Sequence, residues 1–170
     1  MTKAQVQLVL DLFSRRISEN EFLTRFPLKL AKAPEVLREE LQLATKHQDS
    51  GTVEHVMIVA KRFGLLAGLT DIMRTLCFED WHMQHENIAM AFQQLKDPLA
   101  VDGLYHMATT RYPYLDYDEA YALAVKCIWA LKAIDTPLAG EKLRLLAKSD
   151  NPIIVRNARE RLASMDQTAT

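Results

Sequence analysis

The chain has 170 residues, of which 49% are hydrophobic and 25% are charged, and its formal net charge at pH 7 is −1. This length accommodates one domain with a substantial core, and we expect the protein to be soluble. The near-zero charge gives no global preference for nucleic acid or for an anionic membrane surface. Five glycines and six prolines are few for an all-β fold, which needs many tight turns, so we expect an all-α fold.

The N-terminal segment and the two cysteines indicate the compartment. Polar residues interrupt the first sixteen positions, so we expect no secretory signal peptide. No run approaches the roughly 18 apolar residues that a membrane span requires. Cys77 and Cys127 both lie in apolar helical stretches, where buried thiols are expected rather than a disulfide. We therefore expect a cytoplasmic protein.

Two helices are expected at the N-terminus. Apolar residues at helical spacing predict the first helix over residues 3–16. Ser18 and Glu21 match a capping box, in which the serine hydroxyl accepts from the glutamate amide and the glutamate side chain reaches back to the serine amide. A short second helix follows and ends before Pro27. These helices do not match the rest of the chain, and we interpret residues 1–33 as a cap.

After this cap the sequence repeats a helical pattern. The segments that begin at Ile88 and at Cys127 align so that an apolar helical stripe ends each time at a proline, Pro98 or Pro137. A helical period of roughly 30 to 40 residues is typical of an α-solenoid. The helices expected from this pattern cover residues 34–47, 53–63, 66–77, 85–95, 97–110 and 116–134, followed by helices that begin at Thr136-Pro137 and at Asn151-Pro152.

The pattern groups these helices into one domain of about four helix pairs. The second helices of the pairs align in columns, and the middle column contains only small or β-branched residues, which let helices approach closely: Val59, Ala91, Ala130 and Ala158. The domain expected, 1–170, consists of the cap at 1–33, helical hairpins at 34–64, 65–96, 97–135 and 136–165, and a frayed tail at 166–170.

Three segments carry a resemblance to a known family. Residues 95–104 contain Asp-Pro-Leu-Ala-Val, residues 134–143 contain Thr-Pro-Leu-Ala, and residues 150–158 read Asp-Asn-Pro-Ile-Ile-Val-Arg-Asn-Ala. They resemble the short HEAT repeats first noted in phycobilisome lyases, whose paired helices begin Asp-Pro-x-Ala-Val-x-x-Leu and Asp-x-x-Val-Arg-x-x-Ala. The resemblance covers residues 88–162. It implies a right-handed α-α superhelix, a HEAT-like solenoid that binds another molecule, usually a protein.

Little in the sequence indicates catalysis or metal binding. His82 and His85 are followed by Glu86, but two histidines are too few for a metal site, and no spacing argument brings His106 near them. HEAT-like iron hydroxylases use several His-Glu pairs, whereas only one is present here. The chain has no glycine-rich phosphate loop and no serine or cysteine nucleophile motif. We expect no enzyme activity, no catalytic residue, no metal and no cofactor.

Negative charge is concentrated between Glu79 and Tyr121, where eight acids and two bases give a net charge of −6. This segment contains two long connections, 79–84 and 111–119, which emerge as neighbours on one edge of a regular stack. Their aromatic rings supply contact area, and their carboxylates steer a basic partner. The alternative is that the tyrosines roof the core and several acids cap helices. The predicted partner-binding residues are Glu79, Asp80, Trp81, Tyr112, Tyr114, Asp116, Tyr117, Asp118 and Glu119.

The leading hypothesis is a non-enzymatic protein-binding module. A small HEAT-like stack with an acidic-aromatic edge resembles bacterial immunity proteins, which neutralise a cognate toxin. The expected partner is a basic toxin or enzyme domain such as a nuclease; no membrane partner is expected. One alternative is a lyase-type or chaperone-type HEAT protein acting on a partner protein. Another is nucleic-acid binding, which the acidic middle disfavours because it would repel phosphates; its candidate residues are Lys142, Arg144, Lys148, Arg156, Arg159 and Arg161.

Overall fold

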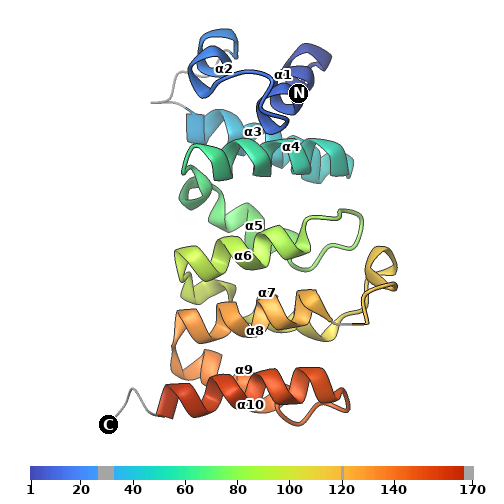
Figure 1. Ribbon diagram of the computed structural model, residues 1–170, viewed down its shortest axis with the longest axis vertical. Coiled ribbons are helices and arrows are strands. Elements are labelled where there is room, and N and C mark those ends of the chain that lie inside the picture. The colour runs from blue at the N-terminus through green and yellow to red at the C-terminus, as the bar shows by residue number, and fades with distance from the viewer. Residues whose placement is uncertain (27–32, 120, 167–170) are drawn as a thin grey trace. The chain divides into compact units, whose positions relative to one another are not determined.

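The computed structural model describes residues 1–26, 33–119 and 121–166, and every regular element in these ranges is a helix (Figure 1). The prediction of an all-α fold is confirmed for this part of the chain. In the same ranges, no helix is both long and apolar enough to cross a membrane. The contacts divide the chain into two compact units, Met1–Ile72 and Met73–Thr170, which are described separately. The grouping into one domain remains a prediction.

In its described residues, 1–26 and 33–72, the first unit contains four complete α-helices and a 3₁₀ helix. α3 packs against α4, and α1 packs against both α2 and α4. Phe22 is fully buried, and its ring stacks on Phe26 and on Phe63 with centroids 4.7 and 5.5 Å apart. The elements are α1 (Lys3–Phe13), α2 (Glu19–Arg25), α3 (Ala33–His47), α4 (Ser50–Arg62) and η2 (Leu66–Leu69).

Local hydrogen bonds correct two predicted helix ends in this unit. The first helix stops at Phe13 rather than at residue 16, because Arg15 adopts a left-handed conformation with φ of 58°. α4 begins at Ser50, three residues earlier than predicted, because Asp49 accepts a hydrogen bond from the Thr52 amide at 3.0 Å. A short polar side chain therefore starts the helix within the residues that separate the helices predicted at 34–47 and 53–63.

The capping box predicted at Ser18 and Glu21 is only half formed, and a complete one lies at the start of α1. The Ser18 hydroxyl accepts from the Glu21 amide at 3.2 Å, as predicted, but the Glu21 carboxylate pairs with Arg25 at 3.0 Å instead of reaching back. The reciprocal pair of bonds forms at the start of α1, between Thr2 and Gln5. The end of α2 before Pro27 agrees with the prediction, whereas residues 27–32 and the tail beyond residue 166 lie outside the described residues.

The second unit is organised around α8, which packs against α6, α7, α9 and α10 (Figure 1). A helix with neighbours on several sides is expected to be apolar around most of its circumference, and seven of its thirteen residues are buried. α5 crosses the boundary between the units. The elements are α5 (Thr70–Leu76), α6 (His85–Leu95), η3 (Pro98–Ala100), α7 (Val101–Thr109), η4 (Pro113–Leu115), α8 (Ala122–Ile134), α9 (Pro137–Leu146) and α10 (Pro152–Asp166).

Cap residues before prolines start three helical segments as predicted. Asp97 accepts from the Leu99 amide at 3.0 Å, and Pro98 opens the 3₁₀ turn that leads into α7. Thr136 starts α9 in the same way. Asn151 starts α10 and accepts from two amides at 2.9 and 3.2 Å. Proline costs nothing at the first position, because its missing amide hydrogen would have no partner there.

The start of α8 and the helix predicted at 66–77 differ from the prediction. α8 begins at Ala122 rather than at residue 116, because Pro113–Leu115 form a 3₁₀ turn and Tyr121 takes a left-handed φ of 54°. The Asp118 carboxylate accepts from the Ala122 amide at 2.6 Å. Residues 66–77 divide into η2 and α5. The irregular loop before α8 is therefore longer than the sequence indicated.

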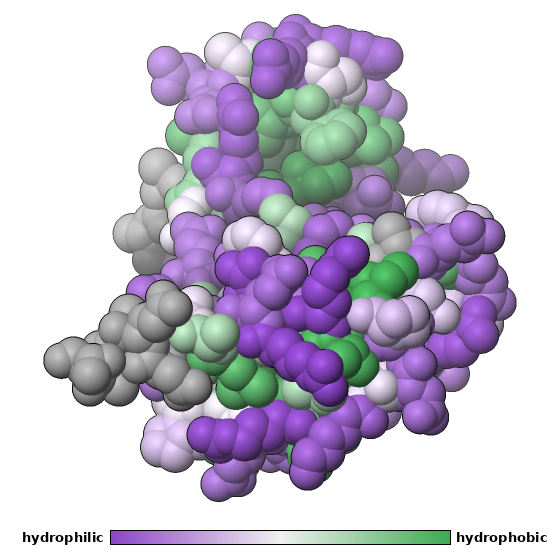
Figure 2. Space-filling model, turned by 60° about the horizontal axis from the view of Figure 1, so that its bottom comes forward, coloured by the Kyte–Doolittle hydropathy of each residue, from purple (hydrophilic) through white to green (hydrophobic). Residues whose placement is uncertain are grey.

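Small side chains let the helices of the second unit approach closely. Ala91, Ala130 and Ala158 are buried, in agreement with the predicted column, and Cys77 and Cys127 are buried free thiols. Gly103 of α7 faces Cys77 so closely that an added Cβ would lie 2.8 Å from the Cys77 Cβ. Figure 2 views the α9–α10 end of this unit, where hydrophilic side chains leave only narrow apolar strips between them.

We expect Gly103→Ala to lower the free energy of unfolding by about 1–2 kcal/mol. Overpacking costs typically about 1–3 kcal/mol, which exceeds a helix-propensity gain of up to roughly 1 kcal/mol. Urea denaturation measures the change. Gly140→Ala in α9 is the matched control, because the nearest atom to its added Cβ is 3.7 Å away on flexible Arg144. The control should be neutral or stabilising, and equal losses in the two variants would contradict the close contact at Gly103.

Candidate functional site

A column of stacked rings joins the two loops that the sequence singled out. His82 and His85 are both buried, and their ring centroids are 4.1 Å apart. Trp81 packs edge-on against His82 at 5.2 Å, and Tyr112 packs on His85 at 3.8 Å. The ring of Tyr114 lies 5.8 Å from that of His85. His85, the first residue of α6, therefore bridges the connection at 79–84 and the loop at 111–119, and His82 packs behind it.

Hydrogen bonds define the protonation of His82. Its Nε2 lies 2.9 Å from the Leu76 carbonyl oxygen, which can only accept, so Nε2 carries the proton. Its Nδ1 accepts from the Gln84 amide at 3.1 Å. Burial lowers the pKa of His82, in agreement with a neutral ring.

His85 has the same tautomer and connects both loops. Its Nε2 donates to the Glu79 carbonyl at 2.7 Å, and its Nδ1 accepts from the Tyr114 hydroxyl at 2.8 Å. Burial, followed by the nearby charge of His82 when protonated, lowers the pKa of His85 to about 4. Burial also raises the pKa of Tyr114 to about 12, so its hydroxyl keeps the proton that it donates. At neutral pH, both histidines are therefore structural hydrogen-bonding groups.

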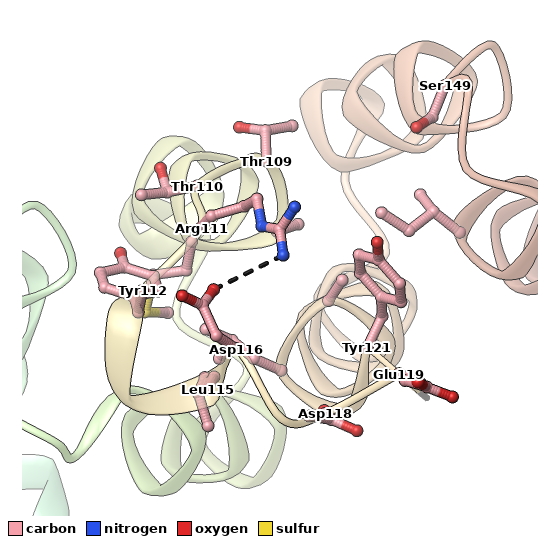
Figure 3. A pocket seen from close by; sticks show the side chains of 15 residues that line it. Thr109, Thr110, Arg111, Tyr112, Leu115, Asp116, Asp118, Glu119, Tyr121 and Ser149 are labelled. Atoms are coloured by element: carbon pink, nitrogen blue, oxygen red, sulfur yellow. Dashed lines mark hydrogen bonds and ion pairs between the residues drawn. The ribbon is translucent and has the colours of Figure 1, made fainter.

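A pocket of about 470 Å³ lies beside the loop that precedes α8 (Figure 3). Arg111 and Asp116 point toward one another with 3.5 Å between their nearest nitrogen and oxygen, whereas Asp118 and Glu119 point away from this pair. The lining comes from the end of α7, the loop, the start of α8, the segment between α9 and α10, and the start of α10: Met107, Ala108, Thr109, Thr110, Arg111, Tyr112, Leu115, Asp116, Asp118, Glu119, Tyr121, Leu123, Ala124, Ser149 and Ile154.

Ion pairs redistribute the charge of the acidic segment. Three of its acids pair with bases from outside the segment: Glu86 with Lys126 at 2.9 Å, Asp97 with Arg74 at 2.7 Å, and Asp102 with Lys142 at 2.7 Å. The acids on the helices are thus neutralised, and the excess negative charge remains on the two loops. In the loops, Asp80, Asp116 and Glu119 are exposed.

The predicted partner-binding residues fall into a supporting group and an exposed group. Tyr112 is only 3% exposed, and Tyr114 is half-buried in its bond to His85, so both support the loop. Trp81 is half-buried and donates through Nε1 to the Glu79 carboxylate at 2.8 Å. Tyr117 is 82% exposed and presents its ring to solvent. Tyr112 and Tyr114 therefore fill the supporting role, one of the two alternatives that the sequence left open, whereas Tyr117 is free of the core.

Sequence reasoning missed His82 and His85 as the centre of this arrangement, because it considered them as candidate metal ligands. It also missed the contribution of Arg111, Tyr121 and Ser149 to the pocket. The only available signal was the aromatic content of both connections, because no spacing rule links position 85 to position 114.

The described side chains at this site can be assessed as ligands for a metal ion and as nucleophiles. Among them, no group of three or more His, Cys, Asp or Glu residues is placed to hold a metal ion. Both nitrogens of His82 and of His85 already have hydrogen-bond partners. Burial raises the pKa of Cys77 to about 12 and that of Cys127 well above its usual value, so both thiols stay protonated.

Comparison of the chain with protein-family models, with curated proteins and with solved structures finds no match.

We expect His85 to make the folded state less stable in mild acid. The pKa of histidine in the unfolded chain is about 6.5, and that of His85 in the folded chain is about 4. Between these values the unfolded state binds more protons, so the free energy of unfolding falls as the pH decreases from about 6.5 to about 4. The contribution of His85 reaches at most about 3 kcal/mol.

Urea denaturation across this pH range, compared between the parent chain and His85→Gln, measures this contribution, and the variant should show the shallower slope. NMR of the ring nitrogens should find His85 neutral at pH 5 with the proton on Nε2, while exposed His47 supplies a reference signal. A protonated His85 ring at pH 5 would contradict the prediction.

We expect Tyr114→Phe to lower the free energy of unfolding by about 1–2 kcal/mol, because it leaves the buried His85 Nδ1 without a donor. Thermal or urea denaturation measures the loss. Tyr117→Phe removes the hydroxyl of an exposed ring in the same loop and should leave stability unchanged. If both variants are as stable as the parent chain, the Tyr114–His85 bond does not hold the loop.

Proposed function

We propose that the chain is a non-enzymatic protein-binding module of the immunity or inhibitor type, which neutralises a basic toxin or enzyme domain. The observation that carries the proposal is the loop at 111–119. This loop presents the exposed Tyr117 ring next to the exposed carboxylates of Asp116 and Glu119, and Tyr114 fixes its base to a buried histidine.

The proposed architecture is a HEAT-like solenoid of about four helix pairs behind an N-terminal cap. Packing within each unit supports it, because α3 pairs with α4, α7 with α8, and α9 with α10. In the second unit α8 also contacts α6 and α10, while α7 contacts α9, which is the two-layer order that stacked pairs require. The hydrophilic cover of the α9–α10 end suits a terminal repeat (Figure 2).

Preorganisation supports a binding role for this loop. Ordering a free loop on binding costs free energy, and a loop that is already held in place avoids much of this cost. Here Tyr114 bonds to His85, and Asp118 caps α8. An exposed tyrosine on such a rigid base is the kind of side chain that dominates interface energies.

The distribution of charge favours a basic partner. The helix acids Glu86, Asp97 and Asp102 have basic partners, so the unbalanced negative charge lies on the loops. Clustered charge of one sign steers a partner of opposite charge and accelerates association. A positively charged active site, such as one that binds phosphates, offers the complementary surface.

The pocket beside the loop has room for a lysine or arginine side chain of the partner. Arg111 and Asp116, with side chains 77% and 61% exposed, form a long ion pair at its rim. An exposed pair of this kind contributes little to stability, roughly 0–1 kcal/mol, so a cation from the partner can replace Arg111 at Asp116.

The state of the titratable groups supports a role in binding rather than in catalysis. His85 uses both ring nitrogens in structural hydrogen bonds, and its pKa of about 4 keeps it neutral. Cys77 and Cys127 are buried and protonated, so neither supplies a thiolate nucleophile.

An immunity protein is normally encoded beside its toxin, so the product of the neighbouring gene is the partner to test. We expect the combined substitution Asp116→Lys, Glu119→Lys and Tyr117→Ala to weaken binding to this partner by about a hundredfold or more, because it removes the anchor ring and reverses the steering charge. Asp118 and Tyr114 stay unchanged, since they hold the loop. Surface plasmon resonance measures both rates, and association should slow as salt rises.

The matched control is Glu54→Lys with Glu141→Lys, which reverses two exposed acids outside the loop and changes the net charge equally. Its affinity should stay within about threefold of the parent value. Equal affinity of the loop variant and the control would show that the partner binds another surface.

A further inference from the structure

A second pocket, of about 300 Å³, lies where α6, α8 and α10 come together, and it has the opposite charge. These three helices contact one another through α8. The pocket is lined by one cation from each of three segments, an indole, an amide, a methyl group and one acid: Lys96, Lys132, Arg161, Trp129, Gln93, Ala133 and Asp135.

The acid does not cancel the three cations. Lys132 lies 3.9 Å from Asp135, at the outer limit of an ion pair, and Asp135 has a half-exposed side chain. The distance between Arg161 and Glu160 is 3.5 Å, which is long for an ion pair, and the Glu160 side chain is 53% exposed. The lining therefore keeps a formal charge of +2.

Arg161 supplies the most specific observation. Its guanidinium lies over the Trp129 ring at 4.4 Å, which holds the side chain in place. Its Nε is buried, and among the described residues it has no hydrogen-bond partner. The Arg161 side chain is 27% exposed, so the outer guanidinium nitrogens, rather than the buried Nε, are the donors that a ligand in the pocket can reach.

We propose that this pocket binds the phosphate group of a small organic phosphate. A phosphate monoester carries a charge of about −1.5 to −2 at pH 7, which matches the lining, and its three terminal oxygens can accept from donors in three directions. Lys96, Lys132 and Arg161 offer such donors from three segments. A planar carboxylate has one charge and two oxygens and would leave one donor unpaired. Trp129 is 43% exposed and offers an apolar edge to the organic part of the ligand.

The test uses phenyl phosphate as the probe, with inorganic phosphate in a parallel titration, both at constant ionic strength. Calorimetry on the unmodified chain should give saturable binding of one phenyl phosphate. The chain has two tryptophans, so in Trp81→Phe the fluorescence reports on Trp129 alone and should change along the same binding curve.

Arg161→Gln and Lys132→Gln should each weaken phenyl phosphate binding by about tenfold or more, since each removes a charge-assisted hydrogen bond. Arg159→Gln is the matched control, because Arg159 is exposed on the same helix and does not line the pocket. Its effect should stay below about twofold. Circular dichroism identifies a variant that fails to fold, and the other variant then decides.

Two results would overturn the proposal. The first is a response to phenyl phosphate that does not saturate, or that Arg159→Gln reduces as much as Arg161→Gln does, since both indicate screening of general surface charge. The second is a single-stranded oligonucleotide that displaces phenyl phosphate with a steep salt dependence, which would assign the pocket to nucleic acid. The loop substitutions that test the proposed function leave this pocket intact, so the two proposals fail independently.

Discussion

The geometry of the acidic loops depends on one buried imidazole. His85 donates to the Glu79 carbonyl on one side and accepts from the Tyr114 hydroxyl on the other, so a single ring fixes two connections that are far apart in the sequence. The bond to Glu79 requires a proton on Nε2, the bond from Tyr114 requires a free lone pair on Nδ1, and burial favours the neutral ring that satisfies both. Histidine is usually associated with catalysis or metal binding, but here it acts as a structural link. It fixes the loop that carries the residues proposed to bind a partner.

The two proposed sites lie near opposite ends of α8, and the helix itself explains the signs of their charges. Asp118 caps its first turn, and Lys132 lies in its last turn. Negative charge is favourable near the N-terminus of a helix and positive charge near its C-terminus. The same side chains that stabilise α8 thus contribute an acidic surface at one end and a basic pocket at the other. At 1.5 Å per residue, its thirteen residues separate the two by about 20 Å.

Local chemistry was readable from the sequence, and long-range pairing was not. The starts of α9 and α10 were predicted correctly, because Thr136 and Asn151 bond to amides within three residues. The start of α8 was wrong, since a left-handed tyrosine at position 121 has no sequence signature. The sequence predicted that the two loops are neighbours, but no spacing rule could predict the hydrogen bond between His85 of α6 and Tyr114. The ion pair between Glu86 and Lys126, forty positions apart, could not be predicted from the sequence either. The negative charge of residues 79–121 therefore seemed to be spread over helices and loops, although it is concentrated on the loops.

The left-handed residues have a consequence for how the protein could be engineered. Arg15, Gln48, Lys96 and Asp135 all adopt φ between 53° and 58°, a conformation that costs a side-chain-bearing residue roughly 1 kcal/mol more than glycine. Glycine at Arg15 or Gln48 would recover that stability without touching either proposed site. Lys96 and Asp135 line the basic pocket, so glycine at either position would raise stability but remove a side chain from the proposed ligand-binding site. These four positions thus divide into two that can be optimised freely and two at which stability and recognition compete.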